Sequence, residues 1–78
     1  MGMLELRKDI DDLDDQIIRI LDRRMRIVKE IRALKGDAQM EDTAREREIL
    51  ERLKKLELDV EGSFIDDIWK VIFSYAKR

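Results

Sequence analysis

The feature that most constrains this chain is an uninterrupted run from Met3 to Lys35 that contains no proline and no glycine. Apolar residues recur in it at steps of mostly three and four, which is the helical period. They are Leu6, Ile10, Leu13, Ile17, Ile20, Leu21, Ile27, Val28, Ile31 and Leu34. We therefore predict one amphipathic helix over Met3–Lys35.

The predicted helix is too long for a small subunit to enclose. At ~1.5 Å per residue it would measure ~50 Å. A compact globule of 78 residues has a diameter of only roughly 30 Å. We expect the helix to extend out of its own subunit and to pack on a partner.

The two halves of this helix carry opposite charges. The first half is acidic, with Asp9, Asp11, Asp12, Asp14 and Asp15. The second half is basic, with Arg19, Arg23, Arg24, Arg26, Lys29, Arg32 and Lys35. Two copies related by a two-fold axis would set each acidic half against a basic half. The pattern favours a homodimer with antiparallel long helices.

Size and composition limit how the chain can be stabilised. With 78 residues it makes one domain with a small core. It has no cysteine and no histidine, which excludes disulfides and a His/Cys metal site. Association with another chain remains as the source of stability.

The charge balance argues against several classes of partner. The 17 basic and 19 acidic residues nearly cancel, whereas nucleic-acid binding usually shows a basic excess. No stretch approaches the ~18 consecutive apolar residues of a membrane span, and no signal-peptide pattern opens the chain. We expect a soluble, cytoplasmic protein with no nucleic-acid or membrane partner.

A second helix is predicted after the long one. Gly36 suits the position that ends a helix, and a short polar loop over Gly36–Asp42 follows. Thr43 begins a T-x-x-E capping box with Glu46, which predicts a helix running to about Leu58.

A third helix follows a turn over Asp59–Ser63, with either Asp59 or Ser63 as its N-cap. Its apolar face repeats at helical spacing and consists of Ile65, Ile68, Trp69, Ile72, Phe73 and Ala76. Aromatic residues on such a face usually belong to the core. With no strand signal, the predicted fold class is all-α, with one long helix and two shorter ones.

The chemistry that this sequence offers is carried by cations on or beside apolar stripes. It lacks histidine, cysteine and a Gly-rich phosphate loop, which the common acid–base, nucleophilic and phosphate-binding sites use. Arg24 and Lys35 are about three helical turns apart, ~16 Å along the axis, and project from nearly the same side. Such long side chains can grip one small anion and stabilise charge that grows in a transition state.

Two further arginines extend this pattern. Arg7 lies ~25 Å from Arg24 along the helix, so it can reach the same ligand only from an antiparallel partner helix. Arg45 falls in the first turn of the second helix, where the helix dipole disfavours a cation. Binding an anion there would explain its position.

Each candidate also has a structural explanation when it is taken alone. A solvated helix face accounts for the arginines of the long helix. The dipole at a helix C-terminus favours Lys35, and the capping box accounts for Glu46. An ion pair with Glu48 or Asp42 would account for Arg45.

The ordered combination of motifs resembles the all-helical (AroQ-type) chorismate mutases over nearly the whole chain. It consists of Leu6-Arg7-x-x-Ile10-x-x-Leu13-Asp14, then Arg23-Arg24, Ile31-x-x-x-Lys35, Asp42-x-x-Arg45-Glu46-x-x-Ile49-Leu50-x-x-Leu53 and Ile68-Trp69-x-x-Ile72-Phe73. The resemblance implies an intertwined homodimer of three-helix subunits, in which the long helix is shared between two active sites. It also implies conversion of chorismate to prephenate, a Claisen rearrangement that needs no cofactor and no metal.

The resemblance assigns roles to residues of the long helix. Arg24 would bind a substrate carboxylate, with Arg7 reaching in from the other subunit. Lys35 would donate to the ether oxygen, which gains negative charge as its C–O bond breaks.

The resemblance also assigns roles to residues at the start of the second helix. Glu46 would hold the ring hydroxyl, helped by the backbone at Asp42, while Arg45 would add positive potential and order the Asp42 region. Lys35, Arg24 and Glu46 are thus the expected catalytic residues.

The same family usually places a Gln or Glu one turn beyond the position of Ala76, past the last residue, Arg78. We therefore expect residues 1–78 to be a single domain cut from a longer chain, fused to or associated with another shikimate-pathway enzyme. Two alternatives remain open. One is an enzyme that resembles isochorismate-pyruvate lyase. The other is a non-catalytic or regulatory dimerisation domain that binds an aromatic-pathway metabolite.

Overall fold

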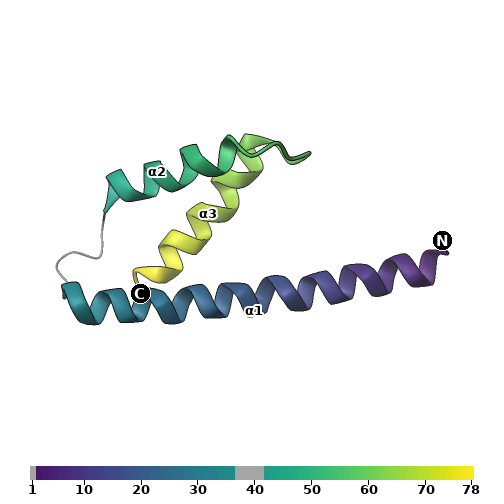
Figure 1. The fold of residues 1–78 in the computed structure, drawn as a ribbon, viewed down its shortest axis with the longest axis horizontal. Helices are drawn as coiled ribbons and strands as arrows, with labels where there is room; N and C mark the ends of the chain where they lie inside the picture. The colour runs from purple at the N-terminus through teal and green to yellow at the C-terminus, as the bar shows by residue number, and fades with distance from the viewer. Residues whose placement is uncertain (1, 37–41) are drawn as a thin grey trace. The chain divides into compact units, whose positions relative to one another are not determined.

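The computed structural model of the protein describes residues 2–36 and 42–78, and every regular element in these ranges is a helix (Figure 1). The helices are α1 (Met3–Lys35), α2 (Thr43–Lys54) and α3 (Gly62–Ala76). The predicted all-α class, with one long and two shorter helices, is confirmed. The chain divides into two compact units. The first, Met1–Ile31, is the larger part of α1, and the second, Arg32–Arg78, holds the end of α1 with α2 and α3.

The predicted bounds of α1 are confirmed at both ends, over 33 residues. The helix stops because Gly36 adopts a φ of +85°, a left-handed conformation that glycine reaches without steric cost. The N–H of Gly36 still donates to the carbonyl of Arg32 at 2.8 Å, which closes the final turn. Residues 37–41 of the predicted polar loop lie outside the described residues.

The predicted start of α2 at Thr43 is confirmed, but the predicted cap is wrong. Asp42 is the N-cap, and its Oδ1 accepts the backbone N–H of Arg45 at 2.9 Å. Thr43 is already the first helical residue, so its side chain is not placed to cap the helix. Aspartate is the stronger N-cap, and its negative charge also favours the positive end of the helix dipole.

We expect Asp42→Ala to lower the free energy of unfolding by about 1 kcal/mol, since it removes this cap. Thr43→Ala is the matched control, because it removes the side chain of the other candidate cap and leaves the observed bond in place. Urea unfolding at one fixed protein concentration, followed by circular dichroism, measures both. An equal loss in Thr43→Ala, with none in Asp42→Ala, would contradict the observed capping.

The end of α2 differs from the prediction, since the helix stops at Lys54 rather than near Leu58. The N–H of Lys55 donates to the carbonyl of Arg52, three residues earlier, at 3.3 Å. Such a bond tightens the last turn and closes the helix. Leu56 and Leu58 are 52% and 59% exposed, so the segment that follows Lys54 is not held in a core by these side chains.

The start of α3 also differs, because neither Asp59 nor Ser63 caps it. Glu61 is the N-cap, in an extended conformation and without a side-chain capping bond. Ser63 already lies inside the first turn, and its Oγ donates to Glu61 Oε2 at 3.5 Å. The backbone of Glu61 receives the first N–H groups instead, including that of Ile65 at 3.3 Å.

The core of the second unit lies where α2 packs on α3, the two helices joined by a short connection in Figure 1. Ile49 of α2 and Ile65 and Ile72 of α3 are its buried apolar residues. Each contributes about 1.5–3 kcal/mol by leaving water. An ion pair between Lys54 and Asp66 joins the same two helices. A core of this size agrees with the expectation that the chain needs a partner.

The predicted apolar face of α3 is confirmed. The buried or half-buried apolar residues of this helix are Ile65, Ile68, Trp69, Ile72, Phe73 and Ala76. Trp69 and Phe73 thus lie on the face that packs, as predicted for core residues. None of the helices in residues 2–36 and 42–78 is both long and apolar enough to span a membrane.

Candidate functional site

Two of the candidate cations, Arg7 and Arg24, lie on α1 in the first unit. Arg24 is half-buried and Arg7 is exposed. Because α1 is unbroken between them, the helical rise applies and separates them by ~25 Å along the axis. One helix therefore cannot bring both side chains to one small ligand. The next arginine on α1, Arg26, forms an exposed ion pair with Asp22 at 2.9 Å, as expected for a solvated helix face.

Lys35 is the last residue of α1, and it is exposed in the second unit. Its position is fixed by Gly36, which ends the helix immediately after it. A cation at this end also complements the negative end of the helix dipole. The local structure is therefore compatible with both the structural and the functional explanation of Lys35.

The structure brings Asp42, Arg45 and Glu46 together on the first turn of α2. The side chain of Asp42 accepts the N–H of Arg45, and its carbonyl accepts the N–H of Glu46 at 3.0 Å. The guanidinium of Arg45 lies 3.8 Å from Glu48, and both side chains are exposed. The turn thus presents a helix N-terminus, a carboxylate and a guanidinium side by side.

The carboxylate of Glu46 is held by a residue of α3's C-terminal end. Nζ of Lys77 lies 3.0 Å from Oε2 of Glu46, and the two side chains are 31% and 24% exposed. Glu46 does not complete the predicted capping box, because Asp42 is the N-cap and the third helical residue is therefore Arg45. Sequence reasoning missed Lys77. The available signal was its position four residues after Phe73, which puts a cation at the end of α3's apolar face.

A second basic residue, Arg32, was also missed as a positioning group. Its guanidinium donates to the carbonyl of Ala76 at 2.9 Å and to a backbone oxygen of Arg78 at 3.0 Å. The carbonyl of Ala76 lies in the last turn of α3 and lacks the intrahelical partner of the helix interior, whereas Arg78 follows the C-cap, Lys77. The sequence contains no local signal for this contact, because it joins residues 44 and 46 positions apart.

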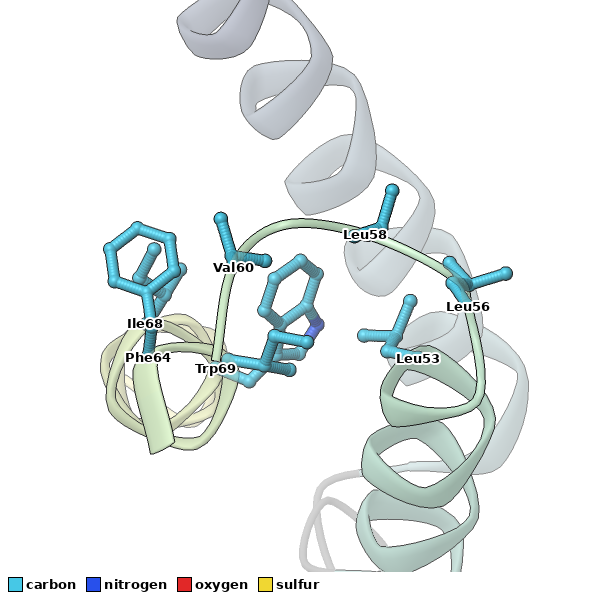
Figure 2. A pocket seen from close by; sticks show the side chains of 8 residues that line it. Leu53, Leu56, Leu58, Val60, Phe64, Ile68 and Trp69 are labelled. Carbon is cyan, nitrogen blue, oxygen red and sulfur yellow. The ribbon is translucent and has the colours of Figure 1, made fainter. Parts of the chain in front are cut away.

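Hollows lie between α2 and α3 in the part of the chain that the structure describes. One, of about 130 Å³, is lined only by apolar side chains from α2, the connection and α3 (Figure 2). They are Leu53, Leu56, Leu58, Val60, Phe64, Ile65, Ile68 and Trp69. A pocket without a charged or polar side chain is unsuited to an anion, because it cannot replace the water that the charge loses.

A second hollow, of about 270 Å³, has a mixed lining. Glu46 and Lys77 contribute charge to it, and Leu50 and Phe73 contribute apolar surface. The Glu46 carboxylate therefore faces a partly apolar, partly charged space rather than open water alone.

The six candidate site residues all carry charged side chains. No group of three or more Asp, Glu, His or Cys side chains that suits a metal ion occurs in residues 2–36 and 42–78. Lys35 supplies an ammonium group at the end of α1, and the start of α2 supplies the carboxylates of Asp42 and Glu46 and the guanidinium of Arg45. Such groups bind a polar anion and stabilise charge that develops on it.

Comparisons with known proteins agree with the motifs. The family model for chorismate mutase type II matches residues 6–78. Over 60 residues the chain is 40% identical to the bifunctional chorismate mutase/prephenate dehydratase of Aquifex aeolicus (strain VF5). The match covers 74% of this chain but only 17% of that relative, so the chain spans about a sixth of its length. No solved structure matches the chain at a significant level.

Proposed function

Because the chain belongs to the type II chorismate mutase family, we propose that it catalyses the rearrangement of chorismate to prephenate. The observation that carries this proposal is the family match over residues 6–78, a range that contains all six candidate site residues. The relative from Aquifex aeolicus, whose name includes a chorismate mutase, supports it.

The reaction suits the side chains that the chain offers. It breaks one C–O bond and forms one C–C bond within a single molecule, so it requires neither a nucleophile nor a proton donor. The enzyme must hold a flexible dicarboxylate in a reactive pose and stabilise the ether oxygen as it becomes negative. Cations and hydrogen-bond donors on rigid helices can do both.

In this proposal Arg24 binds a substrate carboxylate, with Arg7 of the second subunit beside it. Lys35 donates to the ether oxygen. Its interaction strengthens as the C–O bond breaks, so it lowers the barrier rather than only improving binding.

The first turn of α2 holds the substrate's ring in the same proposal. The carboxylate of Glu46 accepts the ring hydroxyl, and the backbone at Asp42 assists it. Arg45 contributes positive potential near the substrate. Arg45 also orders the Asp42 region in this proposal, and the bond from its backbone N–H to the side chain of Asp42 supports this second role.

We also propose an intertwined homodimer with two shared sites. The apolar stripe of α1 supports it, since α1 has no buried residue in the described structure. Ile10, Leu13 and Ile17 along this stripe are 58%, 54% and 55% exposed. So long an apolar row is typical of a surface that a partner covers. A second copy supplies an identical row and places an acidic half against a basic half.

The proposal also covers an associated enzyme and the cellular location. The name of the Aquifex relative joins a chorismate mutase to a prephenate dehydratase, which supports a fused or associated shikimate-pathway enzyme. A cytoplasmic location is included because the substrate is a charged, water-soluble metabolite.

The test is a direct assay of purified protein with chorismate, in which substrate loss and prephenate formation are both followed. We expect chorismate to disappear faster than without protein and prephenate to appear in equal amount. Absence of any acceleration would overturn the enzymatic proposal and favour a non-catalytic binding domain. Release of pyruvate from isochorismate, without prephenate from chorismate, would instead indicate a lyase.

A further inference from the structure

The last turn of α3 is held by the end of α1. The guanidinium of Arg32 donates to the carbonyl of Ala76 at 2.9 Å and to a backbone oxygen of Arg78 at 3.0 Å. Carbonyls at a helix C-terminus carry partial negative charge, and a planar guanidinium presents two donors to them at once. Arg32 thereby fixes the backbone on either side of Lys77.

The side chain of Lys77 extends from the end of α3 to the start of α2. Its Nζ lies 3.0 Å from Oε2 of Glu46, with the two side chains 31% and 24% exposed. A second ion pair between α2 and α3, that of Lys54 with Asp66, is more exposed, at 39% and 44%. Screening by water therefore weakens the contact of Lys77 less than that second pair.

The contacts of Arg32 with the end of α3 and of Lys77 with Glu46 connect the end of α1, the end of α3 and the start of α2. We propose that Lys77 is a positioning residue for Glu46: it holds Oε2 of the carboxylate and so presents the other oxygen to the substrate's hydroxyl. This inference rests on the proposed function, in which Glu46 contacts the substrate. A carboxylate has acceptor sites on both oxygens, so a bond to Lys77 leaves capacity for the substrate.

Two physical effects make such positioning useful. A glutamate side chain has several rotamers, and fixing one before the substrate arrives lowers the entropy lost on binding. A dicarboxylate substrate is also repelled by a lone carboxylate, and the charge of Lys77 offsets that repulsion. A purely structural ion pair between α2 and α3 would show neither effect in the kinetics.

The experiment measures kcat and KM for chorismate in the full chain. Lys77→Met removes the charge but keeps an unbranched side chain, and we expect kcat/KM to fall about 10-fold. Lys77→Arg keeps a cation and should restore kcat/KM to within about threefold of the wild type. Lys54→Met is the matched control. It removes the second α2–α3 ion pair and should change kcat/KM by less than about twofold.

A double-mutant cycle with Glu46→Gln separates positioning from packing. If Lys77 acts through Glu46, Lys77→Met should add little to the loss already caused by Glu46→Gln. The ratio of wild-type to Lys77→Met kcat/KM should also shrink as salt rises, because salt screens the repulsion. Lys77→Gln repeats both measurements if Lys77→Met fails to fold.

The outcomes are distinguishable. No loss in Lys77→Met, the same loss in the Glu46→Gln background, or an equal loss in Lys54→Met would overturn the positioning role alone. Full activity in Glu46→Gln would overturn the proposed role of Glu46 and the inference with it. A wild-type protein that does not convert chorismate would overturn the proposed function itself.

Discussion

Lys35→Ala is expected to lower kcat for chorismate about 100- to 1000-fold, with a much smaller change in KM. The reason is that negative charge develops on the ether oxygen only as the reaction proceeds. The ether oxygen of bound chorismate is nearly neutral, so Lys35 contributes little to substrate binding. As the C–O bond breaks, the oxygen becomes negative, and a donor already in place stabilises it without reorganisation.

The matched control for this prediction is Lys29→Ala. Lys29 is an exposed lysine on the same helix, six residues earlier, and it faces a different side of α1. Its replacement should leave kcat within about twofold of the wild type. Lys35 also lies in the last turn of α1, where a cation favours the helix dipole by about 0.3–1 kcal/mol. Unfolding measurements separate that stability effect from the kinetic one. Full activity in Lys35→Ala would contradict the assignment of Lys35 to the active site.

Ile17→Asp is expected to dissociate the proposed homodimer and abolish activity. Ile17 is 55% exposed in the described chain, so the substitution does not disturb a packed core within one subunit. In the proposed dimer it buries a carboxylate without a partner, which costs about 3–5 kcal/mol. The dimer dissociation constant should therefore rise by more than about 100-fold. Both proposed active sites should be lost, because each is proposed to combine residues of two chains.

Sedimentation over a range of protein concentrations measures this effect, together with the turnover of chorismate. Arg19→Asp is the control, since it introduces the same carboxylate two residues later, on the opposite side of α1. We expect it to remain dimeric. A monomeric wild type, or an Ile17→Asp variant that stays dimeric and active, would contradict the proposed interface.

The sequence was sufficient to predict the features that depend on local rules. The bounds of α1 follow from a helical period without interruption and from Gly36, whose φ of +85° few other residues adopt. The apolar face of α3 follows from its spacing alone. Both predictions needed no knowledge of what lies across the fold.

The sequence predicted the N-cap and the last residue of α2 incorrectly, because more than one residue suits each end of that helix. Asp42 and Thr43 are both good N-caps, and the stronger one was not the one that completed a capping box. The second helix was predicted to run to about Leu58, past its true end at Lys54. A periodic pattern shows which face is apolar, but the final hydrogen bonds decide where the helix stops.

The contacts of Glu46 could not be predicted from local patterns at all. Glu46 and Lys77 lie far apart in the sequence and meet only because α2 packs on α3. The roles of Arg7, Arg24 and Lys35 in a shared site remain a prediction that rests on the family and on helical spacing. That spacing gives the length of α1 a purpose, since one long helix can carry a cation to each of two sites.

The most direct test of this shared-site arrangement uses purified heterodimers made by co-expression of two differently tagged chains. A dimer of one Arg7→Ala chain and one Arg24→Ala chain should retain one intact site and about half of the wild-type activity. A dimer of one wild-type chain and one chain with both substitutions should be nearly inactive, because each site then lacks one arginine. The reverse result, with activity only in the second heterodimer, would place Arg7 and Arg24 of one chain in the same site and contradict the account.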